Sequence, residues 1–362
     1  MTAPRQDGSA RRVGVLTFHR CINYGSYWQA RQLVEGLTAL GYRTELLDHR
    51  CRNAGWAEYR CAFQPTLPMR TSPADLYLYG AKARAFEGAI AALPLSARFA
   101  LHQPETAPAY DIVLIGSDEV WNLSHPWYGG TPIFYGAGVQ ADRLVSYAAS
   151  FGNYDAGAGL HASWAERLDG FDAISVRDGN SQRLVRQATG RTPVRVLDPC
   201  LLFPPRIPSA AIATKLPYVA LYGHSFPSWF AAAVGGWAKR RGIRLLSIGY
   251  RNRWADEHCI AAGPAEFAAL VAGAVAVVTN FFHGCVFALV NAKPFACVSS
   301  DYRSNKISDL VAGLGAERHL VNEHTPIATY DDLLRQPLDR SIGDAIAARR
   351  RDSLAYIADA LA

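Results

Sequence analysis

The sequence predicts an α/β protein with two doubly wound domains, each built on a parallel sheet, that face each other across a cleft. Three observations lead to this prediction. Short apolar runs alternate with segments of helical periodicity along most of the 362 residues, which is the pattern of β-α-β units. Most of these runs end in small or polar residues, as strands do at the ligand edge of such sheets. Residues 203–217 form the best linker between two such patterns, because four prolines fall there: Pro204, Pro205, Pro208 and Pro217.

The first half of the chain gives the first alternating pattern. Residues 13–18 are continuously apolar, which is typical of a buried parallel strand. A helix follows and ends at Gly41, with apolar side chains at helical spacing: Tyr27, Ala30, Leu33, Leu37 and Leu40. Further strands are predicted over residues 44–48, 111–116, 144–147, 173–176 and 194–197. Residues 52–108 break the pattern, so we expect helices inserted into the first domain.

The second half repeats the alternation. Strands are predicted over residues 218–222, 244–248, 274–278 and 294–298, and helices over residues 228–241 and 264–273. Strong helical periodicity near the end of the chain predicts a closing helix packed on the fold. We therefore expect a flexible N-terminus over residues 1–11, domains over 12–205 and 206–340, and the closing helix over 341–362.

Composition limits the classes of function. Half of the residues are apolar and 19% are charged, the balance of a soluble globular protein. Lys and Arg exceed Asp and Glu by 37 − 31 = 6, but no run of five basic residues occurs, so no nucleic-acid partner is expected. The longest apolar run, residues 267–278, is shorter than the roughly 20 residues that span a bilayer. Seven cysteines without a CxxC pair, and a polar start without a signal peptide, indicate a reduced, cytoplasmic location.

The turn after the first predicted strand is a candidate binding element. Asn23, Tyr24 and Gly25 lie where the strand gives way to a helix, and backbone N–H groups at a helix start bind anions. A positive φ at Gly25 would let a ligand approach closely. The alternative is an ordinary turn in which Asn23 or Ser26 caps the helix.

Polar residues also cluster after the strand predicted over 111–116. Ser117, Asp118, Trp121 and Asn122 occupy one loop there. A carboxylate such as Asp118 can accept a proton from a hydroxyl group, and the Trp121 ring offers a face for a sugar. In the alternative, Ser117 or Asp118 is a capping residue and Trp121 lies in the core.

Two charged residues follow the next strands. Arg177 is a candidate fork for an anionic group, and its alternative is a surface arginine near a helix start. Asp198 precedes Pro199, where a simple turn is the favoured interpretation.

His283 is the strongest candidate of the second domain. It follows an apolar strand, with Asn280 before it and Gly284 after it, and a histidine so placed can act as a general acid or an anion ligand. A structural histidine is the alternative. Asn305 and Lys306, after the next strand, would add polar groups to the same cleft unless they form a solvated turn. Histidines and cysteines at metal-ligand spacing are absent from the sequence, so no metal is expected.

Together these segments resemble the polysaccharide pyruvyl transferase family. The matching stretches occur in the family's order and cover roughly residues 13–320: 16–19, 23–25, 29–30, 116–118, 121–122, 146–152, 175–178, 197–199, 279, 282–284, 293–295, 305–307, 310 and 318.

The resemblance implies two Rossmann-like domains in a GT-B-like arrangement, with the acceptor side in the first domain and the donor side in the second. It implies transfer of the enolpyruvyl skeleton of phosphoenolpyruvate to hydroxyls of a sugar, a glycan or a lipid-linked saccharide, which forms a pyruvate ketal and releases phosphate. Phosphoenolpyruvate would be a co-substrate, and no other cofactor is implied. His283 would be the acid or phosphate ligand, Arg177 the anion clamp and Asp118 the group that activates the acceptor. Further substrate contacts would come from Asn23, Tyr24, Gly25, Ser117, Trp121, Asn122, Asn280, Gly284, Asn305 and Lys306.

Two other functions stay open at this point. A glycosyltransferase could use a nucleotide sugar in the same two-domain cleft. A non-catalytic glycan-binding member is suggested by Phe281, because many ketal-forming members carry an arginine at this position, two residues before the histidine. Release of phosphate, of a nucleotide or of neither would separate the three functions.

Overall fold

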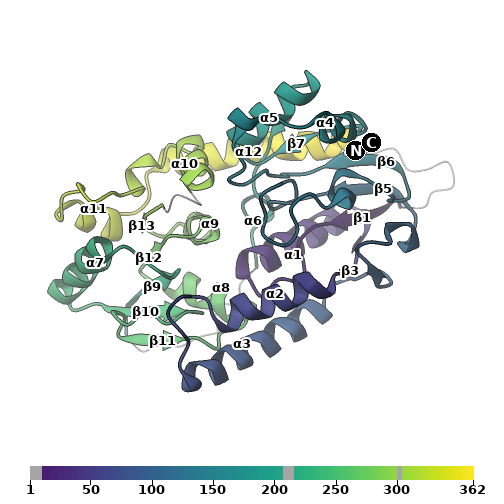
Figure 1. The fold of residues 1–362 in the computed structure, drawn as a ribbon. Coiled ribbons are helices and arrows are strands. Elements are labelled where there is room, and N and C mark those ends of the chain that lie inside the picture. Colours follow the sequence, from purple (N-terminus) through teal and green to yellow (C-terminus); the bar gives the residue numbers. More distant parts are fainter. Residues whose placement is uncertain (1–9, 207–215, 300–303) are drawn as a thin grey trace. The chain divides into compact units, whose positions relative to one another are not determined.

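The computed structural model describes residues 10–206, 216–299 and 304–362, and Figure 1 traces the chain. The chain divides into two compact units. Unit 1 comprises Met1–Ala57, Ile90–Pro204 and Ala347–Ala362, and unit 2 comprises Glu58–Ala89 and Pro205–Ile346. One change of unit thus falls between Pro204 and Pro205, next to the boundary expected from the proline-rich segment. Residues 207–215 of that segment, and residues 1–9 of the expected N-terminal tail, lie outside the described residues.

A parallel sheet of strand order β2-β1-β5-β6 forms the centre of unit 1. The sheet follows from apolar strands that are buried on both faces, such as β5. Its strands are β1 (Arg12–Leu16), β2 (Arg43–Leu46), β5 (Tyr110–Ile115) and β6 (Ala141–Ser146). Two short pairs of parallel strands lie beside this sheet. Isolated bridges from Leu46 to Leu95 and from Val145 to Ala173 join the chain next to these pairs to the sheet. These pairs are β3 (His49–Arg50) with β4 (Phe99–Ala100), and β7 (Ser175–Val176) with β8 (Val194–Arg195).

Helix α1 (Tyr24–Ala39) connects β1 to β2, as the sequence predicts. Its apolar residues, including Leu33 and Leu37, are fully buried, and Gly41 follows the helix with a φ of 97°. The other helices of unit 1 are α4 (Ala162–Asp169), α5 (Gly179–Thr189), α6 (Pro199–Leu202), the start of α2 (Arg52–Phe63) and most of α12 (Arg340–Ala360). Unit 1 also contains three short 3₁₀ turns among its described residues: η1 (Pro104–Thr106), η2 (Pro132–Tyr135) and η3 (Ala156–Ala158).

The predicted closing helix is α12. Hydrogen bonds tie its C-terminal part to the rest of unit 1. Ser353 Oγ accepts the Leu197 N–H at 3.0 Å, Arg350 Nε donates to the Leu201 carbonyl at 2.6 Å, and Tyr356 Oη donates to the Ser146 carbonyl at 2.7 Å. These bonds explain why residues 347–362 belong to unit 1 although they end the chain.

Unit 2 is built on a parallel sheet of order β11-β10-β9-β12-β13. The strands β9 (Tyr218–Tyr222) and β10 (Arg244–Ile248) confirm the predicted bounds, and β12 (Ala276–Thr279) and β13 (Phe295–Cys297) overlap the predicted runs. The sequence did not predict β11 (Glu257–Cys259), whose three residues are all only partly buried. After β9 the chain builds two strands on one side and then β12 and β13 on the other, so the strand order reverses between β9 and β12.

Most helices of unit 2 connect the strands of this sheet along the chain or follow the last of them. Helices α7 (Ser228–Arg241) and α8 (Pro264–Gly273) confirm the predicted bounds, and Gly242 ends α7 in the left-handed conformation. The others are α9 (Phe282–Val290), α10 (Ser304–Gly313), α11 (Thr329–Arg335) and the 3₁₀ turn η4 (Glu317–His319). Across the described stretches of both units, every helix falls short of the length or hydropathy needed to cross a bilayer.

Helix α3 (Pro73–Ala91) corrects one expectation. Residues 52–108 were expected within the first domain, but residues 58–89 belong to unit 2. Lys82 Nζ donates to the Gly249 carbonyl at 3.1 Å, the Asp75 carboxylate pairs with the Arg251 guanidinium, and Tyr79 Oη accepts the Arg251 N–H at 3.3 Å. The partners of α3 come so much later in the chain that a local sequence pattern does not reveal them.

Candidate active site

Asp118 is the centre of a polar cluster at the carboxyl edge of the unit 1 sheet, where its strands end. It follows β5, and its Oδ2 accepts the Ser26 hydroxyl at 2.8 Å. Its Oδ1 accepts the Glu119 N–H at 2.9 Å and a guanidinium N–H of Arg177 at 3.4 Å. The carboxylate is therefore held from α1, from its own loop and from the segment after β7.

The backbone that presents Asp118 is unusual. Asp118 has a φ of 77°, in the left-handed region that non-glycine residues rarely adopt. Just before it, Gly116 has a φ of 119°, and a Cβ there would lie 2.2 Å from the Tyr147 carbonyl oxygen. Strained backbone of this kind concentrates at functional sites, which supports a functional role for Asp118.

Arg177 links two carboxylates inside unit 1. Its Nη1 donates to Asp198 Oδ2 at 3.1 Å and its Nη2 to Asp118 Oδ1 at 3.4 Å, and only 3% of its side chain is exposed. Burial favours the neutral side chain, but the charges of Asp118 and Asp198 outweigh burial and raise the pKa of Arg177. The surface-arginine alternative is therefore wrong, and a fixed, buried cation lies at this edge.

Asp178 and Asp198 begin helices. Asp178 Oδ1 accepts the Ser181 N–H at the start of α5 at 2.7 Å, and Ser150 donates its hydroxyl to Oδ2 at 2.6 Å. Asp198 caps α6 by accepting the Cys200 N–H at 3.0 Å. Asp198 thus does more than begin a turn, because its second oxygen also binds Arg177.

Three residues predicted to bind substrate in the loop after β5 are buried instead. Trp121 has no exposed surface, and its indole N–H donates to the Phe134 carbonyl at 2.7 Å. A sugar ring cannot stack on a covered face, so the core alternative is correct for Trp121. Ser117 is also fully buried, and the Asn122 amide donates to Glu119 Oε2 at 2.8 Å. In this structure Asn122 supports the loop that carries Asp118.

The turn at Asn23 is a helix cap. Asn23 Oδ1 accepts the N–H groups of Gly25 at 2.8 Å and Ser26 at 3.2 Å. Tyr24 is fully buried, and Gly25 lies in the first turn of α1 without the positive φ that would let a ligand approach closely. The capping alternative is therefore the one observed. The role of the turn is to place Ser26 against Asp118.

In unit 2, the corresponding edge lies where the strand order reverses between β9 and β12. Thr279 ends β12, and its hydroxyl donates to the Tyr222 carbonyl of β9 at 2.6 Å. Asn280 donates its amide to the His224 carbonyl at 2.8 Å. These bonds fix the loop that leads into α9. His283 lies in the first turn of α9 and is 8% exposed.

Two residues after β12 explain how α9 begins. A Cβ at Gly284 would lie 1.9 Å from Thr279 Oγ1, so only glycine fits where the helix passes the end of the strand. Phe281 is the N-cap residue and has no side-chain oxygen to accept an N–H. Its ring packs edge-on against Tyr222 and Tyr250, with centroids 5.0 and 5.5 Å apart. Phe281 thus makes aromatic contacts at the position where an arginine, expected from the family resemblance, would place a positive charge.

The last two predicted residues lie in α10. Lys306 is 9% exposed and is part of the first turn of this helix. Asn305 is helical as well, but its side chain lies outside the described residues.

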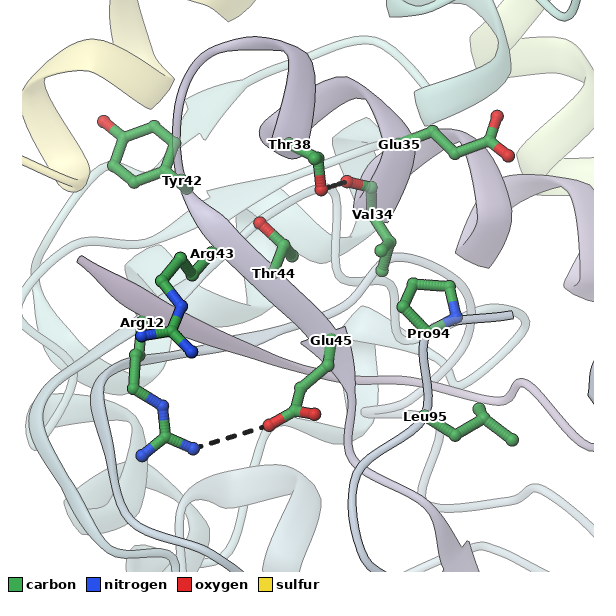
Figure 2. Close-up of a pocket in the computed structure, with 10 residues that line it drawn as sticks. All are labelled: Arg12, Val34, Glu35, Thr38, Tyr42, Arg43, Thr44, Glu45, Pro94 and Leu95. Carbon is green, nitrogen blue, oxygen red and sulfur yellow. Dashed lines mark hydrogen bonds and ion pairs between the residues drawn. The ribbon is translucent and has the colours of Figure 1, made fainter. Parts of the chain in front are cut away.

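A pocket at the opposite, amino edge of the unit 1 sheet lies away from these residues. It has a volume of about 890 Å³ and lies between α1, β2 and the segment at Pro94. Figure 2 shows Arg12 directed toward Glu45, at 3.5 Å, with Arg43 nearby. Ligands of open α/β sheets bind at the carboxyl ends of strands, so we place the candidate active site there rather than in this pocket.

The sequence did not predict several contacts at the carboxyl edge of unit 1. Ser26, Ser150 and Asp198 hold the charged residues in place, yet each looks like an ordinary cap or turn residue in the sequence. A second charged cluster, Arg20 and Arg98 around Asp48, was missed as well. The position of Asp48 at the end of a predicted strand was the available signal.

Comparisons with known proteins identify the family of the chain and support its fold. A family model described as polysaccharide pyruvyl transferase matches residues 23–302. A search of curated proteins gave no significant match. Among solved structures, UDP-GlcNAc 2-epimerase from Methanocaldococcus jannaschii, in complex with UDP-GlcNAc and UDP, has a TM-score of 0.50 at 11% identity, over 95% of this chain and 99% of that one. The glycosyltransferase SnogD from Streptomyces nogalater has a TM-score of 0.46 at 13% identity, over 98% and 99%. The chain has the fold of GT-B proteins, with two Rossmann-like units.

Proposed function

Because the chain belongs to the polysaccharide pyruvyl transferase family, we propose that it transfers the enolpyruvyl skeleton of phosphoenolpyruvate to two hydroxyls of a sugar or glycan. A proton adds to the methylene carbon, one hydroxyl oxygen attacks the adjacent carbon, phosphate leaves, and the second hydroxyl closes a pyruvate ketal. The family match over residues 23–302 is the observation that carries this proposal.

Asp118 is the residue we propose to activate the acceptor. It is a carboxylate at the carboxyl edge of unit 1, and its side chain is 13% exposed, so a hydroxyl can reach it. The bonds from Ser26 and Arg177 fix its orientation. A preoriented base of this kind contributes roughly 10²–10⁴-fold to a proton transfer.

We propose one donor-binding residue in each unit. Arg177 would hold the carboxylate or phosphate of the donor with its guanidinium group, whose position the bonds to Asp118 and Asp198 fix. His283 would protonate the methylene carbon or bind the phosphate, and Lys306 would add a positive charge in unit 2. The sequence motifs around these residues support the assignment.

The test follows phosphate release and the mass of the acceptor. Phosphoenolpyruvate and a set of glycans should give acceptor-dependent phosphate, and the acceptor should gain the mass of pyruvate less water. His283→Gln should lower turnover by about 10²-fold or more if the histidine is the acid. His324→Gln is a matched control in the same unit, because 87% of that side chain is exposed, and it should leave turnover unchanged.

Other products would contradict the proposal. Nucleotide release from a nucleotide sugar, without phosphate from phosphoenolpyruvate, would favour a glycosyltransferase. Glycan binding without release of either would favour a non-catalytic protein. The proposal includes a cytoplasmic location and no metal or further cofactor, so a chelator should leave phosphate release unchanged.

A further inference from the structure

A second charged cluster lies at the carboxyl edge of unit 1. The Asp48 carboxylate accepts Arg20 Nε at 2.5 Å and Arg20 Nη2 at 2.7 Å, and it accepts Arg98 Nε at 3.1 Å. His19, which is fully buried, lies behind it, with Nε2 at 3.2 Å from Asp48 Oδ1. We call these groups the Arg20–Asp48–Arg98 cluster.

Three segments far apart in the sequence build this cluster. Arg20 follows β1 and Asp48 follows β2, so both lie beyond the carboxyl ends of adjacent strands. Arg98 directly precedes β4, which pairs with β3 in the register His49 to Phe99. The Phe99 N–H also donates to the Asp48 carbonyl at 3.1 Å, which fixes Arg98 beside Asp48.

The cluster carries more positive than negative charge. Two guanidinium groups share one carboxylate, and Asp48 is 4% exposed, whereas the side chains of Arg20 and Arg98 are 28% and 53% exposed. Burial of Asp48 opposes its ionisation, but the bonds from His19, Arg20 and Arg98 together outweigh burial and hold the pKa of Asp48 well below its usual value. The carboxylate therefore stays charged and anchors both arginines.

The arginines keep donors for another group. Asp48 binds Nε and Nη2 of Arg20 but only Nε of Arg98. Arg20 Nη1 and both terminal nitrogens of Arg98 have no hydrogen-bond acceptor among the residues that the structure describes. Arginine side chains whose inner nitrogens are already fixed lose less freedom when the outer ones bind a ligand.

We propose that Arg20 and Arg98 bind a phosphate or diphosphate group of the acceptor. Donors from two separate guanidinium groups match the several oxygens and higher charge of a phosphate, whereas a single fork satisfies a carboxylate. That this phosphate belongs to an acceptor rests on the proposed function, because the same edge carries Asp118. The binding itself does not depend on pyruvyl transfer.

The first experiment measures binding without any reaction. Titration calorimetry with inorganic pyrophosphate should detect binding that the double variant Arg20→Ala/Arg98→Ala weakens by at least about tenfold. Arg98→Ala alone leaves Asp48 bonded to Arg20 and should fold normally, with a smaller loss of affinity. Arg43→Ala is the matched control, because Arg43 lies at the amino edge of the same sheet (Figure 2), and it should bind like the wild type.

Two results would overturn the proposal. One is an affinity for pyrophosphate that stays unchanged in Arg98→Ala and in the folded double variant. The other is an equal loss in Arg43→Ala, which would show an effect of total charge only. If pyrophosphate binding depends on Arg20 and Arg98 but the protein does not transfer pyruvyl groups, the anion site is confirmed. In that case only the assignment of its phosphate to an acceptor is rejected.

The second experiment identifies the source of the phosphate. Acceptor KM is compared for a lipid-linked diphosphate saccharide, a soluble glycosyl phosphate and the same saccharide without phosphate. Arg98→Ala should raise KM about tenfold for the phosphorylated acceptors that the protein uses, with kcat and the KM of the neutral saccharide unchanged. Equal effects on all three acceptors would contradict the assignment.

Discussion

Replacing Arg177 with alanine should lower the free energy of unfolding by about 3–5 kcal/mol, because the change leaves buried carboxylates without their cation. The side chain of Asp198 has no exposed surface and that of Asp118 is 13% exposed, and both bind the guanidinium. The upper part of the range applies if Asp198 stays charged. The lower part applies if it takes up a proton instead.

Urea unfolding followed by circular dichroism measures this loss. Arg186→Ala is the matched control, since Arg186 is an exposed arginine in the neighbouring helix α5, and it should change stability by less than about 0.5 kcal/mol. Lowering the pH should narrow the gap between wild type and Arg177→Ala, because protonated carboxyl groups no longer need the guanidinium.

A loss below about 1 kcal/mol in Arg177→Ala would refute the reasoning, because it would mean that the carboxylates are hydrated or find other donors. The result also bears on activity. If the variant is folded at the assay temperature and its KM for phosphoenolpyruvate rises, the arginine contacts the donor. If kcat falls alone, Arg177 acts through Asp118.

Three further predictions concern other parts of the fold. Trp121→Phe should destabilise the protein by about 1 kcal/mol, because the hydrogen bond to the Phe134 carbonyl is lost, and it should leave acceptor KM unchanged. A raised acceptor KM would instead indicate that a sugar ring stacks on Trp121. Asp48 has a folded pKa below its unfolded value of about 3.9, so its charge stabilises the fold above pH 4 and this contribution fades as the pH falls. Urea unfolding of Asp48→Asn should therefore show a flatter acid dependence than the wild type, and identical profiles would contradict this. Burial lowers the pKa of Lys82 to about 7, so the unfolded chain binds more protons between pH 7 and 10, and stability should rise with pH by up to about 1.4 kcal/mol per unit. Lys82→Met should remove that rise, and an unchanged slope would contradict the assignment.

Local patterns predicted most of the fold. Strands such as β9 and helices such as α7 have apolar periodicity and clear end signals, so their predicted bounds agree with the structure. Strand β11 was missed because Glu257–Cys259 is not apolar and becomes a strand by pairing with β10. The place of α3 in unit 2 depends on partners such as Gly249 and Arg251, more than 150 residues later in the chain.

The candidate site was predictable only in part, because strand ends locate residues and do not orient side chains. The strand-end rule placed Asp118 and Arg177 at one edge of unit 1, and they are in contact. The rule could not show that Trp121 turns inward to the Phe134 carbonyl. Nor could it find Arg98, which comes just before a strand of two residues.

The chain passes from one unit to the other four times, after residues 57, 89, 204 and 346. During synthesis, unit 1 therefore cannot complete its structure when residue 204 leaves the ribosome, since Leu197 and Leu201 still lack their partners in α12. Those partners emerge only after all of unit 2 has been made, although domains commonly fold in order from the N-terminus. Unit 1 is thus completed only after residues 347–362 have been made, and a nascent chain that stops before residue 347 should be the species that chaperones hold and proteases remove.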